Sequence, residues 1–201
     1  MRSDILARYA VSAGDLITRF EAITSEHHLS PVSDLLPVKS ARIVDIGAGT
    51  GRDAAWLTGK GHHVTAVEPV DELRKAGMQL HPEEAISWIN DCLPELVTLR
   101  RQQPFDLVLL SAVWHHLQNS ERQAALRNLK NIAVQGGLLI ISLRHGGKEH
   151  EGFVFPVSTD ETIAMAERES FELLRQRQTG PMQERSRAAG VHWTWLVFRS
   201  V

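Results

Sequence analysis

The clearest candidate for a ligand site is an apolar segment that ends in an acid and turns sharply through three glycines. Ile43-Val44-Asp45-Ile46 is followed by Gly47-Ala48-Gly49-Thr50-Gly51. Glycines let the backbone approach a ligand closely, and a carboxylate beside them can accept hydrogen bonds or hold a cation. The stretch predicts a ligand-binding turn, although a purely structural strand-to-helix turn could use the same glycines.

The spacing of these glycines limits which cofactor the turn could bind. The dinucleotide-binding fingerprint needs a third glycine or alanine three positions after the second, and Arg52 stands there in this chain. That difference argues against a nicotinamide cofactor and leaves an oxidoreductase as a remote alternative. With Asp45 two residues before Gly47, the stretch resembles motif I of the class I S-adenosylmethionine-dependent methyltransferases.

Later segments continue the resemblance, which covers residues 41–143 well and the C-terminal strands loosely. Glu68 ends HHVTAVE, where the family has an acid that binds the ribose hydroxyls, and Asn90-Asp91 follow ISWI, where the family meets the adenine amino group. Asp91 is the better adenine candidate. An ordinary surface glutamate and a solvated loop are the respective alternatives. Ser111-Ala112-Val113-Trp114-His115-His116-Leu117 resembles the V-x-H-H-L form of small-molecule methyltransferases, and Gly136-Gly137 also match.

The resemblance implies S-adenosyl-L-methionine as cofactor, with Asp45 orienting its cationic amino-acid end and the N–H groups of the glycine turn favouring its carboxylate. It also implies that Trp114 could line the pocket, although burial beneath the following helix is an equal alternative. The implied cofactor-binding residues are Asp45, Gly47, Ala48, Gly49, Gly51, Glu68, Pro69, Asn90, Asp91, Cys92, Ser111 and Trp114.

The candidate catalytic residues are His115 and His116. Histidine titrates near neutral pH and could take a proton from a hydroxyl, amine or carboxylic acid, while the methyl donor is already activated. His115 is the slightly better candidate, and a structural role for either ring stays open.

Several specialised activities are argued against by missing residues. The segment after residue 110 lacks the N/D-P-P-Y motif of adenine-N6 and glutamine methyltransferases. Cys92 is the only cysteine and lies far from the expected reacting end, so neither pyrimidine-C5 nor arsenite chemistry is expected. No carboxylate cluster or Cys/His spacing indicates a metal site.

Acceptor selection is expected to involve the two regions that flank the carboxyl ends of the strands. In the glycine-rich segment 144–152, expected to be a mobile loop, Arg144, His145 and Lys148 could meet an anionic substrate or could be solvated charges. Near the N-terminus, Tyr9 and Arg19 could cover the pocket or serve helix packing. Four further arginines could contact RNA, although a solvated hairpin is preferred: Arg175, Arg177, Arg185 and Arg187.

The elements expected to position these residues form an α/β, Rossmann-like doubly wound sheet, mostly parallel, with an antiparallel C-terminal end and helices on both faces. Apolar runs predict strands over residues 42–45, 63–68, 85–90, 105–110, 138–143, 171–178 and 192–198. Helical periodicity predicts helices over residues 53–60, 70–80, 93–102, 121–134 and 158–169. One or two amphipathic helices precede Ser30-Pro31, and a polar loop spans 180–190.

The whole chain has 201 residues, 43% hydrophobic and 23% charged, with a formal net charge of −2. These values predict one domain (residues 1–40 a helical cover, 41–201 the core), and argue against stable nucleic-acid binding through bulk charge. One cysteine and the absence of a long apolar stretch favour a cytoplasmic protein outside the membrane.

The function expected from this resemblance is methylation of an oxygen or nitrogen atom of a small molecule. An RNA (tRNA) methyltransferase and a non-catalytic S-adenosylmethionine-binding regulatory protein are the alternatives. The acceptor and the oligomeric state stay open.

Overall fold

The fold is built on a seven-stranded mixed sheet with the order β3-β2-β1-β4-β5-β7-β6. A computed structural model describes residues 2–82, 85–147, 153–181 and 187–201. The first five strands are parallel, β7 is antiparallel to β5, and β6 is antiparallel to β7. The strands are β1 (Arg42–Ile46), β2 (His63–Val67), β3 (Ser87–Ile89), β4 (Phe105–Leu110), β5 (Ala133–His145), β6 (Phe171–Thr179) and β7 (His192–Ser200). The predicted α/β sheet with an antiparallel end is confirmed.

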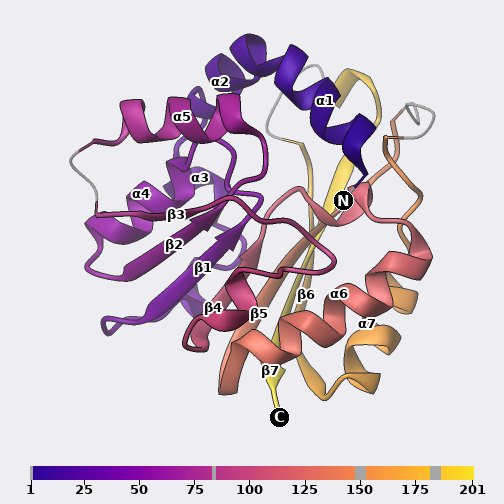
Figure 1. Cartoon of the computed structure of the whole chain (residues 1–201). Helices are drawn as coiled ribbons and strands as arrows, with labels where there is room; N and C mark the ends of the chain where they lie inside the picture. The colour runs from indigo at the N-terminus through magenta and orange to yellow at the C-terminus, as the bar shows by residue number, and fades with distance from the viewer. Residues whose placement is uncertain (1, 83–84, 148–152, 182–186) are drawn as a thin grey trace.

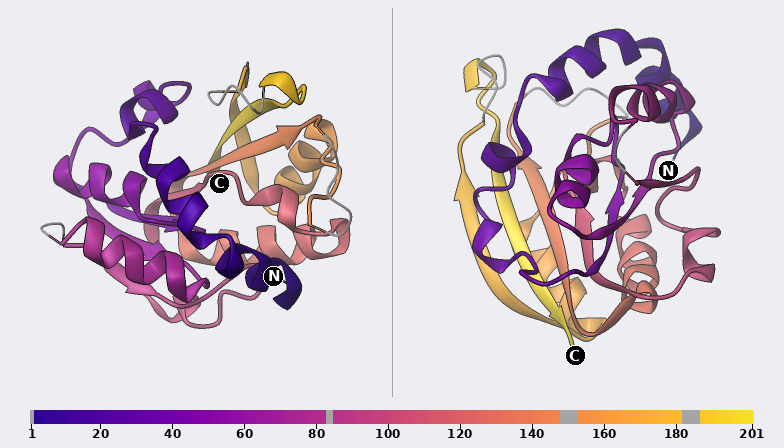
Figure 2. Two further views of the ribbon diagram at one scale, coloured as in Figure 1. Left: turned by 90° about the horizontal axis from the view of Figure 1, so that it is seen from above. Right: turned by 90° about the vertical axis from the view of Figure 1, so that its left-hand side faces the viewer.

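Helices surround this sheet, and α1 and α2 lie across its upper end in Figure 1. Figure 2 shows the same two helices spanning the end of the sheet when the molecule is turned. The α-helices are α1 (Ser3–Val11), α2 (Ala13–Glu21), α3 (Ser25–His28), α4 (Arg52–Gly59), α5 (Asp71–Leu80), α6 (Asn119–Ile132) and α7 (Thr159–Arg168). The 3-10 helices are η1 (Ser33–Leu35), η2 (Leu99–Arg101) and η3 (Trp114–His116).

Strand alternation divides the core between the two faces of the sheet. In β1, Ile43 packs in a cluster with Leu57 of α4, whereas Val44 and Ile46 pack in another that contains Leu129 of α6. Successive side chains of a strand point to opposite faces, so a central parallel strand must be apolar on both sides. Both faces of β1 are therefore covered, and its carboxyl end is fixed in position.

The predicted helix over residues 93–102 is wrong, because the segment forms turns and the short η2. The carboxylate of Asp91 accepts the backbone N–H groups of Thr98 and Leu99 at 2.7 and 2.9 Å. Leu96 has a positive φ of 48°, which is incompatible with a continuous α-helix. A side-chain acceptor thus takes donors that an α-helix would direct to its own carbonyls.

The expectation of a mobile loop from residue 144 also needs correction. Arg144 and His145 are the last residues of β5 and pair with Trp193 and His192 of β7. Residues 148–152, with Lys148, and residues 182–186, with Arg185, lie outside the described residues. The N-terminal segment forms three helices where one or two were expected, and α1 and α2 cross the end of the sheet, as predicted for a region that flanks the carboxyl ends of the strands. Within the described residues, no helix has the length and apolar character needed to cross a membrane.

Candidate functional site

Three strands that end at the same edge of the sheet bring the predicted ligand residues together. Asp45 is near the end of β1, Glu68 directly follows β2, and Ser111 directly follows β4. Parallel pairing of β1 with β2 and β4 aligns these ends. Asp45 and Glu68 interact electrostatically despite their 23-residue separation in the numbering of the chain. The site lies where open α/β sheets generally bind ligands.

The glycine-rich turn uses its own backbone donors. The N–H groups of Gly47 and Ala48 donate to the Val67 carbonyl, and that of Gly49 donates to Glu68. Gly47 has φ of 75°, and a Cβ there would lie 2.4 Å from a methyl carbon of Val113. The glycine at this position thus allows the loop after β4 to close on the turn. The N–H groups of Gly47, Ala48 and Gly49 thus organise the turn itself, and the expected role of the turn toward the cofactor carboxylate stays a prediction.

Asp45 presents a buried carboxylate to this edge. Its side chain is 3% exposed, and within the described residues no group donates a hydrogen bond to it. Burial raises its pKa well above the ordinary value, and the nearby carboxylates of Asp53 and Glu68 raise it further, while Arg52 opposes them. Buried charges require a partner. A cationic ligand group would provide one.

Glu68 is also buried, yet each of its oxygens already has a fixed backbone donor. Oε2 accepts from Gly49 N–H and Oε1 from Val70 N–H, both at 2.8 Å. Burial raises the pKa of Glu68 to about 7, although these two bonds and Arg74 act in the opposite direction. Each carboxylate oxygen has a further lone pair, so the fixed side chain can still accept from a pair of hydroxyls.

After β3, the Asp91 side chain makes its hydrogen bonds mainly within the protein. The Asp91 carboxylate accepts the N–H groups of Cys92, Thr98 and Leu99, which leaves little capacity for a ligand. Asn90 is exposed, while Cys92 is half-buried beside it. Pro69, after β2, is half-buried as well.

His116 is held between two oxygen atoms in a defined orientation. Its Nδ1 lies 2.7 Å from the Phe153 carbonyl, and its Nε2 lies 2.8 Å from the Tyr9 hydroxyl. A carbonyl only accepts, so Nδ1 carries the proton and the tyrosine donates to Nε2 of the neutral ring. Burial lowers the pKa of His116 and raises that of Tyr9 to about 12, which keeps both groups uncharged.

His115 is equally buried but is not tied down in this way. Its ring lies 4.2 Å from the His116 ring and 5.9 Å from that of Trp193, measured between centroids. No hydrogen bond to either ring nitrogen occurs within the described part of the chain, and Nδ1 is buried. Burial, followed by His116 and Arg144, lowers its pKa well below the ordinary value. The ring is therefore neutral and retains a proton-accepting nitrogen.

Trp114 is a core residue in this structure. It has no exposed surface and packs in the cluster that includes Leu126 and Leu129 of α6. This position matches the alternative in which the indole is buried beneath the following helix.

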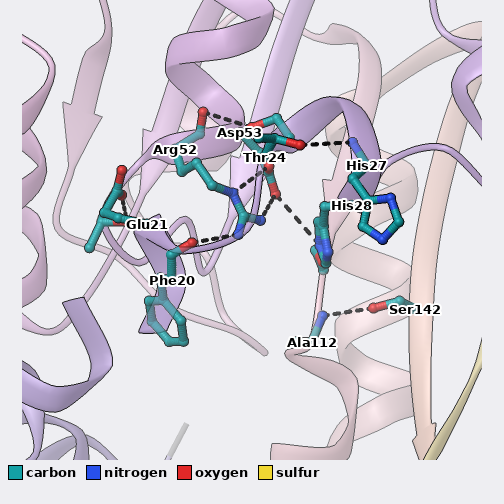
Figure 3. A network of polar contacts seen from close by, with 12 residues as sticks. Phe20, Glu21, Thr24, His27, His28, Arg52, Asp53, Ala112 and Ser142 are labelled. Atoms are coloured by element: carbon teal, nitrogen blue, oxygen red, sulfur yellow. Dashed lines mark hydrogen bonds and ion pairs between the residues drawn. The ribbon is translucent and has the colours of Figure 1, made fainter. Parts of the chain in front are cut away.

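The N-terminal helices are fastened to the glycine turn by a polar network (Figure 3). The guanidinium of Arg52 donates to the Phe20 carbonyl at 2.8 Å and pairs with Asp53 at the same distance. Thr50 donates to Glu21, and the ring of Phe20 packs against Gly49. The cover formed by α1 and α2 is thus in direct contact with the ligand-binding turn.

Sequence analysis missed His28, which joins α3 to this edge. Its Nε2 lies 2.7 Å from Ser111 Oγ. The same nitrogen lies 3.7 Å from a carboxylate oxygen of Asp53 (Figure 3). Ser111 is consequently bound to the cover as well as placed after β4. Since His28 and Ser111 are 83 positions apart, no local pattern could reveal this contact.

Comparison with known proteins gives a family match along most of the chain. A family model described as "Methyltransferase domain" matches residues 15–199. An uncharacterized methyltransferase of Staphylococcus carnosus is 26% identical over 110 residues, 55% of this chain and 50% of that protein. A ubiquinone biosynthesis O-methyltransferase of Xylella fastidiosa is 28% identical over 123 residues, 58% of this chain and 49% of that protein. The chain spans about half the length of these curated relatives.

A solved structure supports the fold. The 1,6-didemethyltoxoflavin-N1-methyltransferase of Burkholderia thailandensis, whose structure contains S-adenosylhomocysteine, aligns with a TM-score of 0.73. The alignment covers 98% of this chain and 87% of that chain at 18% identity. The arrangement of strands and helices is thus shared despite low sequence identity.

Proposed function

This chain belongs to the methyltransferase-domain family, and from that premise we propose that it transfers a methyl group from S-adenosyl-L-methionine to an oxygen or nitrogen atom of a small molecule. The relatives named above include an O-methyltransferase and an N-methyltransferase, so the family alone does not select the atom.

The observation that carries the cofactor assignment is the pair of buried carboxylates at the ends of β1 and β2. Asp45 has no donor within the described residues, which suits the ammonium group of the cofactor. Glu68 is fixed by two backbone donors and retains acceptor capacity for the ribose hydroxyls. Asp91 keeps at most a minor capacity for the adenine amino group, beside Asn90 and Cys92. When bound, S-adenosyl-L-methionine supplies a methyl group activated by the sulfonium charge.

The histidines after β4 are proposed to handle the acceptor proton. His115 is neutral and has no protein hydrogen bond within the described residues, so a ring nitrogen can accept a proton from a hydroxyl or an amine. The His116 lone pair is already used by Tyr9, which makes His116 a positioning residue for the neighbouring ring and for α1.

A small acceptor is favoured over RNA by how the C-terminal arginines are used. Arg175 makes two hydrogen bonds to Asp34, and Arg177 donates to the Pro31 carbonyl. With a net charge of −2 as well, the chain offers no strong general attraction for a polyanion. A cytoplasmic location belongs to the same proposal, since a lone cysteine suits a reducing compartment.

The experiment is methyl transfer from S-adenosyl-L-methionine labelled in its methyl group, using a cell extract divided into small-molecule and RNA fractions. Label in the small-molecule fraction is expected, with loss of label in His115→Ala. Label found only in RNA would show that the acceptor is RNA and not a small molecule. Cofactor binding without methyl transfer to either fraction would favour a regulatory protein.

A further inference from the structure

A small cavity lies beside the segment that contains His115 and His116, here called the histidine segment. The residues that line this cavity are not among those assigned to the cofactor. Its volume is about 160 Å³, and its walls are Arg144, Gly146, Gly147 and residues 154–157. A larger cavity of about 390 Å³ includes Arg42 and His63, the first residues of β1 and β2, so it opens at the opposite edge. Only the smaller cavity is placed near the proposed chemistry.

Hydrogen bonds attach the segment that contains the cavity wall to both histidines. The N–H of Phe155 donates to the His115 carbonyl at 2.8 Å, and His116 Nδ1 donates to the Phe153 carbonyl. Arg122 donates to the Pro156 carbonyl at 2.9 Å and holds the next residue of the wall. A molecule in this cavity would therefore lie beside the backbone of the histidine segment.

Arg144 is the charged residue of the cavity wall. It is half-buried, and one nitrogen donates to the Gly146 carbonyl at 3.0 Å. A Cβ at Gly147 would lie 2.6 Å from another nitrogen of the guanidinium, so the glycine makes room for it. Within residues 2–82, 85–147, 153–181 and 187–201, no carboxylate is close enough to pair with Arg144, whose electrostatic neighbour is Tyr9.

Two further arginines lie against aromatic rings in or next to the wall. The guanidinium of Arg8 lies 4.5 Å from the centre of the Phe153 ring, and that of Arg2 lies 5.9 Å from that of Phe155. Arg144 is close enough to His115, His116 and Tyr9 to affect their pKa values. Arg2 is ion-paired with Asp4, so Arg144 and Arg8 are the cations that would act on an anion bound here.

We propose that this cavity is the acceptor site and that the acceptor is a small molecule bearing a carboxylate, which the guanidinium of Arg144 holds. A guanidinium forms paired, charge-assisted hydrogen bonds to a carboxylate, and a partly desolvated cation gains most from such a partner. The cavity is smaller than sites for drug-sized ligands, and its other walls are apolar or glycine. Anchoring one end at Arg144 would leave the other end beside His115. This inference deepens the proposed function and rests on it.

Calorimetric titration with acetate, butyrate and benzoate, each matched with its primary amide, tests the carboxylate site with and without S-adenosylhomocysteine. At least one acid is expected to bind to the wild type and to bind about tenfold more weakly to Arg144→Gln, the loss typical of a charge-assisted contact. The primary amide of that acid should bind to the wild type about tenfold more weakly than the acid does, because it lacks the negative charge. Arg144→Lys keeps the positive charge but loses the planar guanidinium, so its affinity for the acid should be intermediate. If Arg144→Gln does not fold, the weaker binding of the acid to Arg144→Lys tests the role of Arg144 instead.

The matched control is Arg168→Gln, which removes the same charge from an exposed position on α7 and should leave acid binding unchanged. Equal binding of acids and amides, equal weakening in both glutamine variants, or no binding of any acid at millimolar concentration would overturn the carboxylate site. Failure of S-adenosylhomocysteine binding would instead overturn the proposed function, because acid binding is measured in its absence too.

Discussion

The ionisable side chains of the site are held in uncharged or easily neutralised forms by burial. Burial raises the pKa of Asp45 and Glu68 and lowers that of His115 and His116. Each residue thus bears a desolvation cost that a bound partner could offset. Clustered shifts of this kind are typical of functional sites, and here they coincide with the edge where three parallel strands end.

Asp45→Asn should separate binding from stability. The variant loses the charge proposed to face the cofactor ammonium, so affinity for S-adenosylhomocysteine should fall about tenfold or more. It also removes a buried carboxylate without a donor in the described residues, so the free energy of unfolding of the ligand-free protein should rise. Calorimetry and denaturant unfolding measure the two effects. Asp160→Asn, at an exposed position of α7, is the control, and wild-type affinity in Asp45→Asn would refute the assignment.

Glu68 should leave a signature in the pH dependence of stability. Its pKa is about 7 in the folded protein against an ordinary value of 4.5, so folding favours the protonated form. The stabilisation is complete below pH 4.5 and is lost as pH rises through 7. Glu68→Gln should flatten the decrease in unfolding free energy over that interval. Parallel pH profiles for wild type and variant would show that Glu68 does not titrate as described.

Substitution of His115 and substitution of Tyr9, the donor to His116, should have different effects. His115→Ala is expected to lower kcat by about 100-fold or more with unchanged affinity for S-adenosylhomocysteine, because it removes the proposed base. Tyr9→Phe leaves His116 Nε2 without its donor and should cost about 1 to 2 kcal/mol of stability. Steady-state kinetics and thermal unfolding distinguish these effects, and full activity in His115→Ala would exclude a catalytic role.

At the scale of elements, the cover formed by α1 and α2 connects the two halves of the site. Tyr9 of α1 contacts the segment after β4, while Phe20 at the end of α2 contacts Gly49 and fixes Arg52 through its carbonyl. A ligand that binds beneath this cover gains contacts from both helices, and its dissociation should depend on their stability.

Phe20→Ala should loosen this cover. The half-buried ring packs against Gly49, and its removal should cost about 1 to 2 kcal/mol, less than for a fully buried phenylalanine. Hydrogen exchange in α1 and α2 should accelerate, and S-adenosylhomocysteine should dissociate faster. Val11→Ala changes a side chain that is 89% exposed at the end of α1 and should have neither effect. Equal exchange rates in the two variants would show that Phe20 does not hold the cover.

The elements that sequence reasoning located best are those whose pattern is local. The apolar run FDLVLL predicted β4 with the observed bounds, because a buried parallel strand is apolar on both faces. Residues 93–102 were misassigned because the Asp91 carboxylate binds two N–H groups that a helix would use. Arg144 and His145 resemble loop residues before two glycines, yet they pair with a strand nearly fifty residues later in the chain.

In the candidate site too, local sequence patterns identified some residues, whereas contacts between distant residues could not be predicted. Motif spacing singled out Asp45 and Glu68 at the ends of β1 and β2 and the histidine pair in η3 after β4, and their roles stay predictions. The contacts of Tyr9 with His116 and of His28 with Ser111 join positions 107 and 83 residues apart. They depend on how the N-terminal helices cross the sheet, which no local pattern specifies.

At the scale of the whole molecule, the distribution of charge matters more than its sum. The chain has a net charge of −2, yet the carboxylates of Asp45 and Glu68 lie at the proposed cofactor edge and the guanidinium of Arg144 lines the proposed acceptor cavity. A cationic cofactor and an anionic acceptor would each meet the opposite charge, and the two fields would place them side by side.

The most direct test of this account is calorimetric titration of the purified protein with S-adenosylhomocysteine, with NAD as a parallel titrant and any co-purified ligand removed first. The family assignment, the glycine spacing and the Asp45 carboxylate, which has no hydrogen-bond donor in the described part of the chain, predict saturable binding of S-adenosylhomocysteine and no binding of NAD. Binding of NAD alone, or of neither compound, would contradict the assignment of this edge of the sheet as an S-adenosylmethionine site.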